Sequence, residues 1–169
     1  MGDNDAPRPG TRKLYKFFNK PPRIAYALGL GPIIGRLVLL LTTRGRKTGL
    51  LRVTPLQYEQ IEEKYYVASA FGTRTDWYRN ILADPGVRVR VGRKEFEALA
   101  ETSTDPARIA GFLEVRLARH PRMIGMMLRA EGLPPSPSRQ DLESLAADKA
   151  LVILHPTEKL KPGVRNQRF

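Results

Sequence analysis

The stretch 87–102 constrains the fold most, because it has the pattern of a β-hairpin. Residues 87–91 alternate valine with arginine, and the loop that follows is Gly92-Arg93. A two-residue loop with glycine first is typical of a type II′ turn between antiparallel strands. This loop predicts three cross-strand pairs: Arg90 with Glu95, Arg88 with Glu97, and Val89 with Phe96. One face of the hairpin is then apolar and the other carries paired charges, so we expect an antiparallel sheet that is covered on one side.

Further strands and helices follow from similar patterns. Short apolar runs predict strands at 37–43, 51–58, 64–70 and 150–154. Helical spacing and capping residues predict helices at 75–83, after Asp105-Pro106, at 123–130 and after Ser138. The apolar phase of 51–58 shifts at Pro55, which indicates a bulge or an edge strand, because proline cannot donate to a sheet. Short turns between strands predict a largely antiparallel α+β fold, with about six strands in a small barrel and flanking helices.

The length of 169 residues suits one domain. We expect a disordered N-terminus at 1–10, a single domain with N-terminal helices at 11–156, and a basic tail at 157–169. Residues 12–19 combine aromatic side chains with lysines, which fits a helix on a membrane surface and equally a helix packed on the domain. The apolar stretch 24–41 is interrupted by glycine and proline and is too broken to span a membrane. We therefore expect a cytoplasmic protein, with a peripheral membrane contact left open.

The charge balance is strongly basic, with 29 Lys and Arg against 17 Asp and Glu, a formal net charge of +12. Such a surface attracts nucleic acid, an anionic membrane, or a small phosphorylated or carboxylate-rich ligand. The paired charges of the hairpin argue against the exposed basic-aromatic strands of nucleic-acid-binding barrels, so no nucleic-acid partner is expected. The chain has no cysteine and two histidines, which excludes thiolate sites and multi-histidine metal sites. The oligomeric state stays open.

The turn 42–49 is a candidate anion-binding site. It follows a predicted buried strand and combines two glycines, hydroxyl side chains and three cations. Backbone N–H groups in such a turn can cradle an anion while arginine and lysine neutralise its charge. The spacing and the element that follows differ from those of a P-loop. A solvated basic turn without a ligand is an equally good interpretation of this segment alone.

Three blocks between residues 39 and 91 resemble the deazaflavin-dependent nitroreductases, also called deazaflavin-dependent quinone reductases. The blocks are 40–49 continuing through 52–56, then 67–72, and then 76–85 with Val87 and Val89 after it. Each block is weakly specific, but their order and spacing together are strongly specific. Residues 152–156 are similar to the last strand of the family, though less distinctly. The resemblance implies a split β-barrel that binds the reduced deazaflavin coenzyme F-420 and passes hydride to quinones, nitroaromatics or other acceptors.

The resemblance also implies which residues contact the coenzyme, whose phosphate and oligoglutamate tail make it a polyanion. The residues matched to its tail and phosphate are Arg46, Lys47, Thr48, Gly49 and Arg52. Those matched to its ring system are Thr54, Pro55 and Leu56, with Ala68, Ser69, Ala70 and Phe71 on the neighbouring strand and Trp77, Tyr78 and Asn80 on the short helix. Trp77 and Tyr78 also fit plain core positions. FMN is the alternative cofactor.

The acceptor side departs from the family pattern. Where the best-known branch has a row of tyrosines, this chain has His120, Met123 and Met126. His120 is the ionisable member of that row and a candidate proton donor, although a surface histidine at a helix start fits equally. The two methionines are expected to border a pocket for an apolar acceptor, since methionine adapts to ligands of varied shape. A non-catalytic split barrel that carries a deazaflavin, FMN, haem or a lipid-like ligand is the alternative function.

Overall fold

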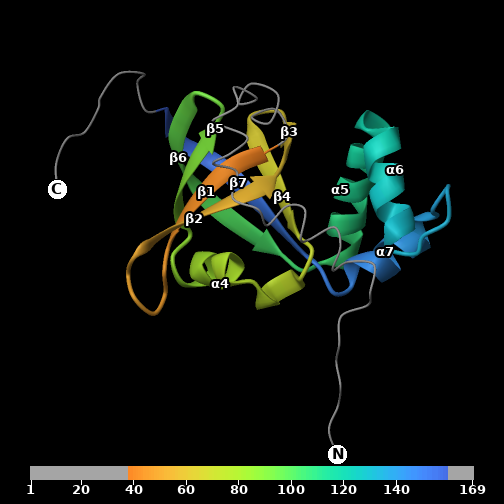
Figure 1. Ribbon diagram of the computed structural model, residues 1–169, viewed down its shortest axis with the longest axis horizontal. Helices are drawn as coiled ribbons and strands as arrows, with labels where there is room; N and C mark the ends of the chain where they lie inside the picture. Colours follow the sequence, from red (N-terminus) through yellow and green to blue (C-terminus); the bar gives the residue numbers. More distant parts are fainter. Residues whose placement is uncertain (1–37, 160–169) are drawn as a thin grey trace, which may run out of the picture.

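The computed structural model in Figure 1 describes residues 38–159, which form one curled sheet and a group of helices. The strands are β1 (Val38–Arg44), β2 (Leu51–Gln57), β3 (Glu59–Ile61), β4 (Lys64–Ser69), β5 (Gly86–Val91), β6 (Lys94–Ser103) and β7 (Ala150–Lys159). The helices are the 3₁₀ turn η1 (Gly72–Arg74), α4 (Asp76–Ala83), α5 (Pro106–Arg119), α6 (Pro121–Ala130) and α7 (Arg139–Ala146). The expected disordered N-terminus at 1–10, the basic helix at 12–19 and most of the expected tail lie outside the described residues.

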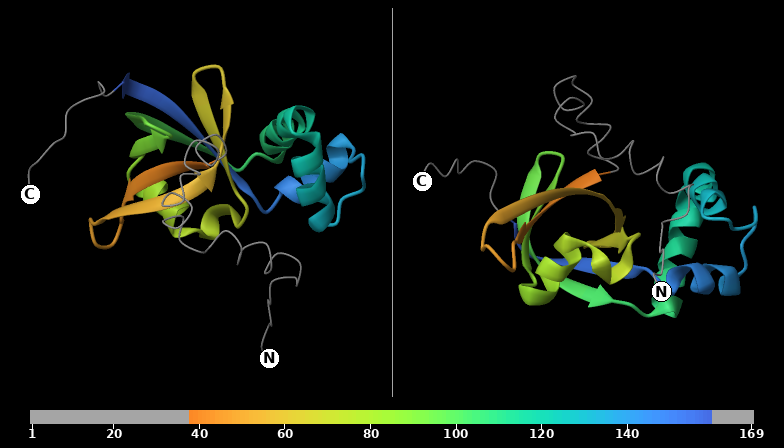
Figure 2. Two further views of the ribbon diagram at one scale, coloured as in Figure 1. Left: turned by 45° about the horizontal axis from the view of Figure 1, so that its top comes forward. Right: turned by 60° about the horizontal axis from the view of Figure 1, so that its bottom comes forward.

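The sheet has the strand order β2-β1-β5-β6-β7-β4-β3, and every pairing in it is antiparallel. It curls into a half-barrel, with α4 at its concave side and α5, α6 and α7 gathered beside it (Figure 2). This confirms the α+β split barrel and its antiparallel character. The described sheet has seven strands where about six were expected, because the short strand β3 pairs with β4 directly after β2 ends.

The hairpin of β5 and β6 has the register that its loop predicts. Arg88 lies opposite Glu97, Val89 opposite Phe96, and Arg90 opposite Glu95. Valine and phenylalanine face the core, so the charged side chains lie on the outer face. The charges pair differently from the simple register: Arg88 approaches Glu97 at 2.9 Å and Glu95 at 3.6 Å, whereas Arg90 donates to the Gly92 carbonyl.

Strand β2 forms one edge of the sheet, which explains the proline in its middle. Pro55 lies opposite Leu40 in a continuous register with β1, so no bulge is present at this position. An edge strand needs no N–H donor on its free side, and proline is tolerated there. The edge interpretation of the phase shift is therefore confirmed, and the bulge interpretation is wrong.

The hydrophobic side chains form two clusters that share β7. The barrel cluster fills the concave side of the sheet and includes Trp77 and Tyr78 of α4. The helical cluster lies between α5, α6, α7 and the opposite face of β4 and β7. Val152 and Leu154 point into the barrel cluster, whereas Leu151 lies in the helical cluster, as expected for alternation along a strand buried on both faces.

Local capping signals place the helices. The Asp105 carboxylate accepts a hydrogen bond from the Ala107 N–H at 3.0 Å and begins α5. Ser138 and Asp141 form the predicted capping box of α7. Gly132, with a φ of 93°, follows α6 as a glycine after a helix end commonly does. No helix in residues 38–159 has the length and apolar character needed to cross a bilayer.

Candidate functional site

The loop between β1 and β2 is closed by its own backbone. The Gly45 N–H donates to the Leu50 carbonyl at 2.8 Å, and the Gly49 N–H donates to the Gly45 carbonyl at 2.7 Å. Gly49 has a φ of 69°, a left-handed conformation that side chains disfavour. This closed loop projects Arg46, Lys47 and Thr48 from the end of the sheet.

Helix α4 holds the loop against the sheet through one buried amide. The Asn80 side chain donates to the Thr43 hydroxyl at 3.2 Å and accepts from the Arg46 N–H at 3.2 Å. The Arg46 guanidinium donates to the same Asn80 oxygen at 3.1 Å and to the Asp76 carboxylate at 2.9 Å. Asn80 therefore connects β1, the loop and α4, and it fixes the position of Arg46.

These elements enclose a depression of about 480 Å³. Seven of the predicted coenzyme residues line it: Arg46, Lys47, Thr48, Arg52, Thr54, Trp77 and Asn80. Its volume lies within the range of roughly 300–1,000 Å³ that is common for small-molecule sites. Lys47 and Arg52 form no ion pair with another residue of 38–159, and the one carboxylate in the lining, that of Asp76, pairs with Arg46.

The other predicted coenzyme residues lie around this depression rather than in its lining. Gly49 closes the loop, Pro55 is exposed on β2, and Leu56 packs on the barrel cluster. Tyr78 is only 2% exposed and belongs to the barrel cluster, in agreement with the core position that the sequence left open. Trp77 both lines the depression and belongs to that cluster.

The segment after β4 is positioned by a serine. The Ser69 hydroxyl donates to the Gly72 carbonyl at 2.7 Å and thereby holds η1 beneath the sheet. Phe71 precedes η1, and Ala70 is exposed. Ala68 points to the opposite face of the sheet and packs on the helical cluster. This predicted block therefore places backbone and small side chains near the concave side, while the side chain of Ala68 is turned away.

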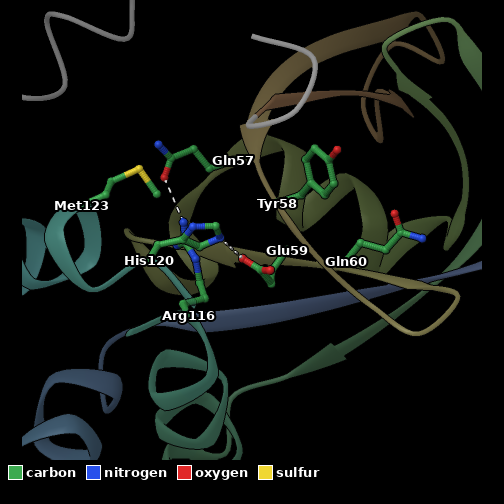
Figure 3. Close-up of a pocket in the computed structure, with 7 residues that line it drawn as sticks. All are labelled: Gln57, Tyr58, Glu59, Gln60, Arg116, His120 and Met123. Atoms are coloured by element: carbon green, nitrogen blue, oxygen red, sulfur yellow. Dashed lines mark hydrogen bonds and ion pairs between the residues drawn. The ribbon is translucent and has the colours of Figure 1, made fainter. Parts of the chain in front are cut away.

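A second cavity, of about 170 Å³, lies between the end of β2 and the junction of α5 and α6. Figure 3 shows its lining residues: Gln57, Tyr58, Glu59, Gln60, Arg116, His120 and Met123. Glu59 is buried, and its carboxylate accepts from Arg119 at 2.8 Å and from His120 Nε2 at 3.1 Å. Two predicted acceptor-side residues, His120 and Met123, thus meet at this cavity.

Met126 lies elsewhere on α6. Its side chain is 59% exposed and is not part of the cavity lining, whereas Met123 is partly buried against the helical cluster. The buried residues of α6 are Ile124, Gly125 and Leu128. The two methionines, three positions apart, therefore occupy different environments.

A family model described as F420H(2)-dependent quinone reductase matches residues 27–122, more than half of the chain. The chain belongs to this family. The matched range includes the β1–β2 loop, α4 and His120, and it ends one residue before Met123. The match confirms the resemblance that the three sequence blocks predicted.

Curated relatives of the family match the chain over a shorter range. F420H(2)-dependent quinone reductase Rv1261c of Mycobacterium tuberculosis (strain H37Rv) is 36% identical over 66 residues, which is 37% of this chain and 44% of the relative. A putative F420H(2)-dependent quinone reductase of Mycobacterium bovis, Mb1292c, gives the same values. The chain thus matches less than half the length of these curated relatives.

Solved structures extend the likeness in fold. A putative 5-nitroimidazole antibiotic resistance protein from Bacteroides thetaiotaomicron has a TM-score of 0.53 at 9% identity, covering 75% of this chain and 76% of that one. The conserved hypothetical protein Rv2991 from Mycobacterium tuberculosis has a TM-score of 0.52 at 14% identity, covering 78% and 80%. At these identities the likeness concerns the fold alone.

Five lining residues of the second cavity were not predicted from the sequence: Gln57, Tyr58, Glu59, Gln60 and Arg116. One of them had a signal in the sequence. Arg116 follows Ile109, Phe112 and Leu113 at the spacing of a single helix face, so a cation occupies a position where a buried apolar residue is expected. Glu59 had no such signal, because its partners Arg119 and His120 lie 60 and 61 residues away in the chain.

Proposed function

We propose that this protein is an oxidoreductase that uses the reduced deazaflavin coenzyme F-420 and reduces a quinone-like, nitroaromatic or related aromatic acceptor. The observation that carries the proposal is the depression beside the β1–β2 loop, where Lys47 and Arg52 face a volume of about 480 Å³ without an ion-pair partner in 38–159. Membership in the F420H(2)-dependent quinone reductase family supports the choice of coenzyme.

The residues present fit a phosphorylated, carboxylate-rich coenzyme. Lys47 and Arg52 supply charge, and the Thr48 hydroxyl adds a hydrogen-bonding group at the same loop. Arg46 is held by Asp76 and Asn80, so its guanidinium is already in position but is partly neutralised. Trp77 supplies an apolar wall beside these polar groups. The coenzyme would supply the hydride, and the chain would supply position, charge and exclusion of water.

The second cavity is the candidate acceptor site, because strand β2 leads to it from the depression. Thr54 lines the depression and Gln57 lines the cavity about 10 Å further along the strand, although their side chains lie on opposite faces of it. Reduction of a quinone or nitro group places negative charge on oxygen, which needs a hydrogen-bond donor and a proton. We assign proton donation to the imidazolium form of His120, in which Nε2–H donates to the Glu59 carboxylate, which orients the ring, and Nδ1–H remains to donate its proton to a ligand.

Equilibrium binding of coenzyme F-420 and of FMN to the purified full-length protein tests the proposal. We expect the deazaflavin coenzyme to bind more tightly, because FMN has a phosphate but no oligoglutamate tail for the basic loop. Oxidation of the reduced coenzyme in the presence of 2-methyl-1,4-naphthoquinone, followed by its visible absorbance, then separates an enzyme from a carrier. Tighter binding of FMN would overturn the coenzyme assignment. Coenzyme binding without oxidation by any quinone or nitroaromatic compound would favour the carrier function.

A further inference from the structure

Arg116 is an unusual residue for its position. It projects from the apolar face of α5 and is 6% exposed, yet its Nε has no hydrogen-bond partner among the residues that the structure describes. One hydrogen bond of its guanidinium is recorded, from Nη2 to the Gln57 side-chain oxygen, and at 3.4 Å this bond is long. Burial lowers the pKa of Arg116, and the charge of Glu59 opposes that effect. A buried cation with so little compensation is costly to fold.

The nearest carboxylate does not relieve this cost. One oxygen of Glu59 accepts from Arg119 Nη1 at 2.8 Å, and the other accepts from His120 Nε2 at 3.1 Å. Arg116 forms no ion pair within 4.0 Å with a described residue. The single carboxylate of Glu59 therefore pairs with Arg119 and leaves Arg116 unpaired, so positive charge is in excess here even when His120 is neutral.

The cavity beside Arg116 has room for a small group only. Its volume of about 170 Å³ is below the roughly 300–1,000 Å³ of sites that enclose a whole drug-sized ligand. Figure 3 shows that Arg116 and His120 enter it from the helices, while Gln57 and Glu59 enter it from the strands. A head group of a larger molecule could contact these polar side chains while the rest of that molecule lies outside.

We propose that this cavity binds the anionic head group of an aromatic ligand, such as a ring-bound carboxylate, through the Arg116 guanidinium and the imidazolium form of His120. A planar guanidinium matches a carboxylate well, and an anionic ligand would supply the counter-charge that the buried cation lacks. The role of this cavity as the acceptor site rests on the proposed function. If it holds the acceptor, the preferred acceptors are aromatic compounds that carry an acidic group. The sequence predicted that Met123 and Met126 border an acceptor pocket; Met123 lines this mainly polar cavity and Met126 does not.

Binding of 2-naphthoate and 2-naphthamide, measured by calorimetry on the full chain without coenzyme, tests the proposal directly. The two compounds have nearly the same shape, and only the first is charged. We expect wild-type protein to bind 2-naphthoate at least about tenfold more tightly, as a charge-assisted contact would give. Equal affinity for the two compounds would overturn the proposal without any variant.

Variants then show which positively charged residue the carboxylate of 2-naphthoate contacts. Arg116→Met keeps an apolar stem on the Phe112 ring, which the guanidinium contacts at 5.8 Å, and removes the cation. We expect it to abolish the preference for 2-naphthoate, whereas Arg116→Lys, which keeps the charge, should retain part of it. Arg90→Met is the matched control for loss of one exposed positive charge and should leave the preference unchanged. If Lys47→Ala loses the preference for 2-naphthoate while Arg116→Met keeps it, the carboxylate binds at the β1–β2 loop and the assignment to the cavity is wrong.

Coenzyme titration keeps this proposal apart from the proposed function. Arg116→Met should bind coenzyme F-420 as wild type does, because Arg116 is not in the lining of the larger depression. If wild-type protein binds 2-naphthoate but no coenzyme, the cavity assignment stands and the proposed function fails. With a functioning enzyme, Arg116→Met should raise KM for 1,4-naphthoquinone-2-sulfonate by about tenfold or more and leave KM for 2-methyl-1,4-naphthoquinone nearly unchanged. Equal changes in both KM values would contradict a role in recognising the acidic group.

Discussion

Arg46 and Lys47 are neighbours in a basic loop, but the structure surrounds them differently. Arg46 donates to the Asn80 side chain and to the Asp76 carboxylate, so it joins the loop to α4. Lys47 has no ion pair within 38–159 and faces the depression directly. We therefore expect the first residue to act mainly on loop position and stability, and the second mainly on ligand affinity.

Two alanine variants separate these roles. Lys47→Ala should raise the dissociation constant of coenzyme F-420 by about 10- to 150-fold, the value of one charge-assisted contact, with an unchanged melting temperature. Arg46→Ala should cost about 1 kcal/mol of stability, a fall of about 2–4 °C in Tm for a chain of this size. Calorimetry for the coenzyme and a thermal melt for each variant give both numbers.

The matched control for this pair is Arg93→Ala, which removes one exposed charge from the β5–β6 loop. Its coenzyme affinity should stay within about twofold of the wild-type value and its melting temperature should not change, as is usual for exposed surface residues. A weaker coenzyme affinity in Arg93→Ala comparable with that in Lys47→Ala would mean that net charge, rather than a contact in the loop, governs binding.

At the scale of elements, η1 is held in a tight place between β4 and the segment before β7. Gly72 has a φ of 56°, and a Cβ at this position would lie 2.4 Å from the Asp148 carbonyl oxygen. The Ser69 hydroxyl, which donates to the Gly72 carbonyl, fixes the same segment. The glycine is therefore needed both for its left-handed backbone and for the close approach of another backbone.

Gly72→Ala should destabilise the protein more than Gly92→Ala does. Gly92 has nearly the same φ, 59°, but no atom lies within 4 Å of its added Cβ. Both variants should carry the left-handed penalty of about 1–2 kcal/mol, and the overlap should add roughly 1–3 kcal/mol at Gly72 alone. Urea unfolding of the two variants gives the difference, which isolates the steric contribution because the backbone strain is common to both.

Equal unfolding free energies for the two glycine variants would show that the segment around Asp148 moves aside at little cost. In that case η1 would not be a rigid support for α4. The coenzyme affinity of Gly72→Ala is a useful second readout, because α4 contributes Trp77 and Asn80 to the depression.

At the scale of the whole molecule, the net charge of +12 favours association with anionic ligands. We expect the affinity for coenzyme F-420 to fall as salt rises from about 0.05 to 0.5 M and to fall with a shorter glutamate tail, because exposed charges are screened over about 10 Å at 0.1 M. Calorimetric titrations at several salt concentrations measure the slope. Lys47→Ala should reduce that slope, and a slope of zero for the wild-type protein would exclude the basic loop as the tail site.

Much of the fold could be predicted from the sequence because its signals are local. The alternation at 87–91 and the glycine-first loop determined the hairpin register to the residue, and the structure confirms it. Asp105-Pro106 and the Ser138 capping box marked helix starts, since capping depends on neighbouring residues only. The three blocks of the family pattern also lie in the sequence, and they indicated the family that the comparison confirms.

The tertiary structure alone decided which charged residues have partners. Arg46 meets Asn80 across 34 residues of sequence, and Glu59 meets Arg119 and His120 across about 60, so no local pattern could reveal these contacts. Arg116 shows the same limit, because its helix position indicated burial but not the missing partner for its Nε. Local periodicity determines which face of an element is buried, whereas hydrogen bonding between distant elements depends on how the whole sheet curls and where the helices pack against it.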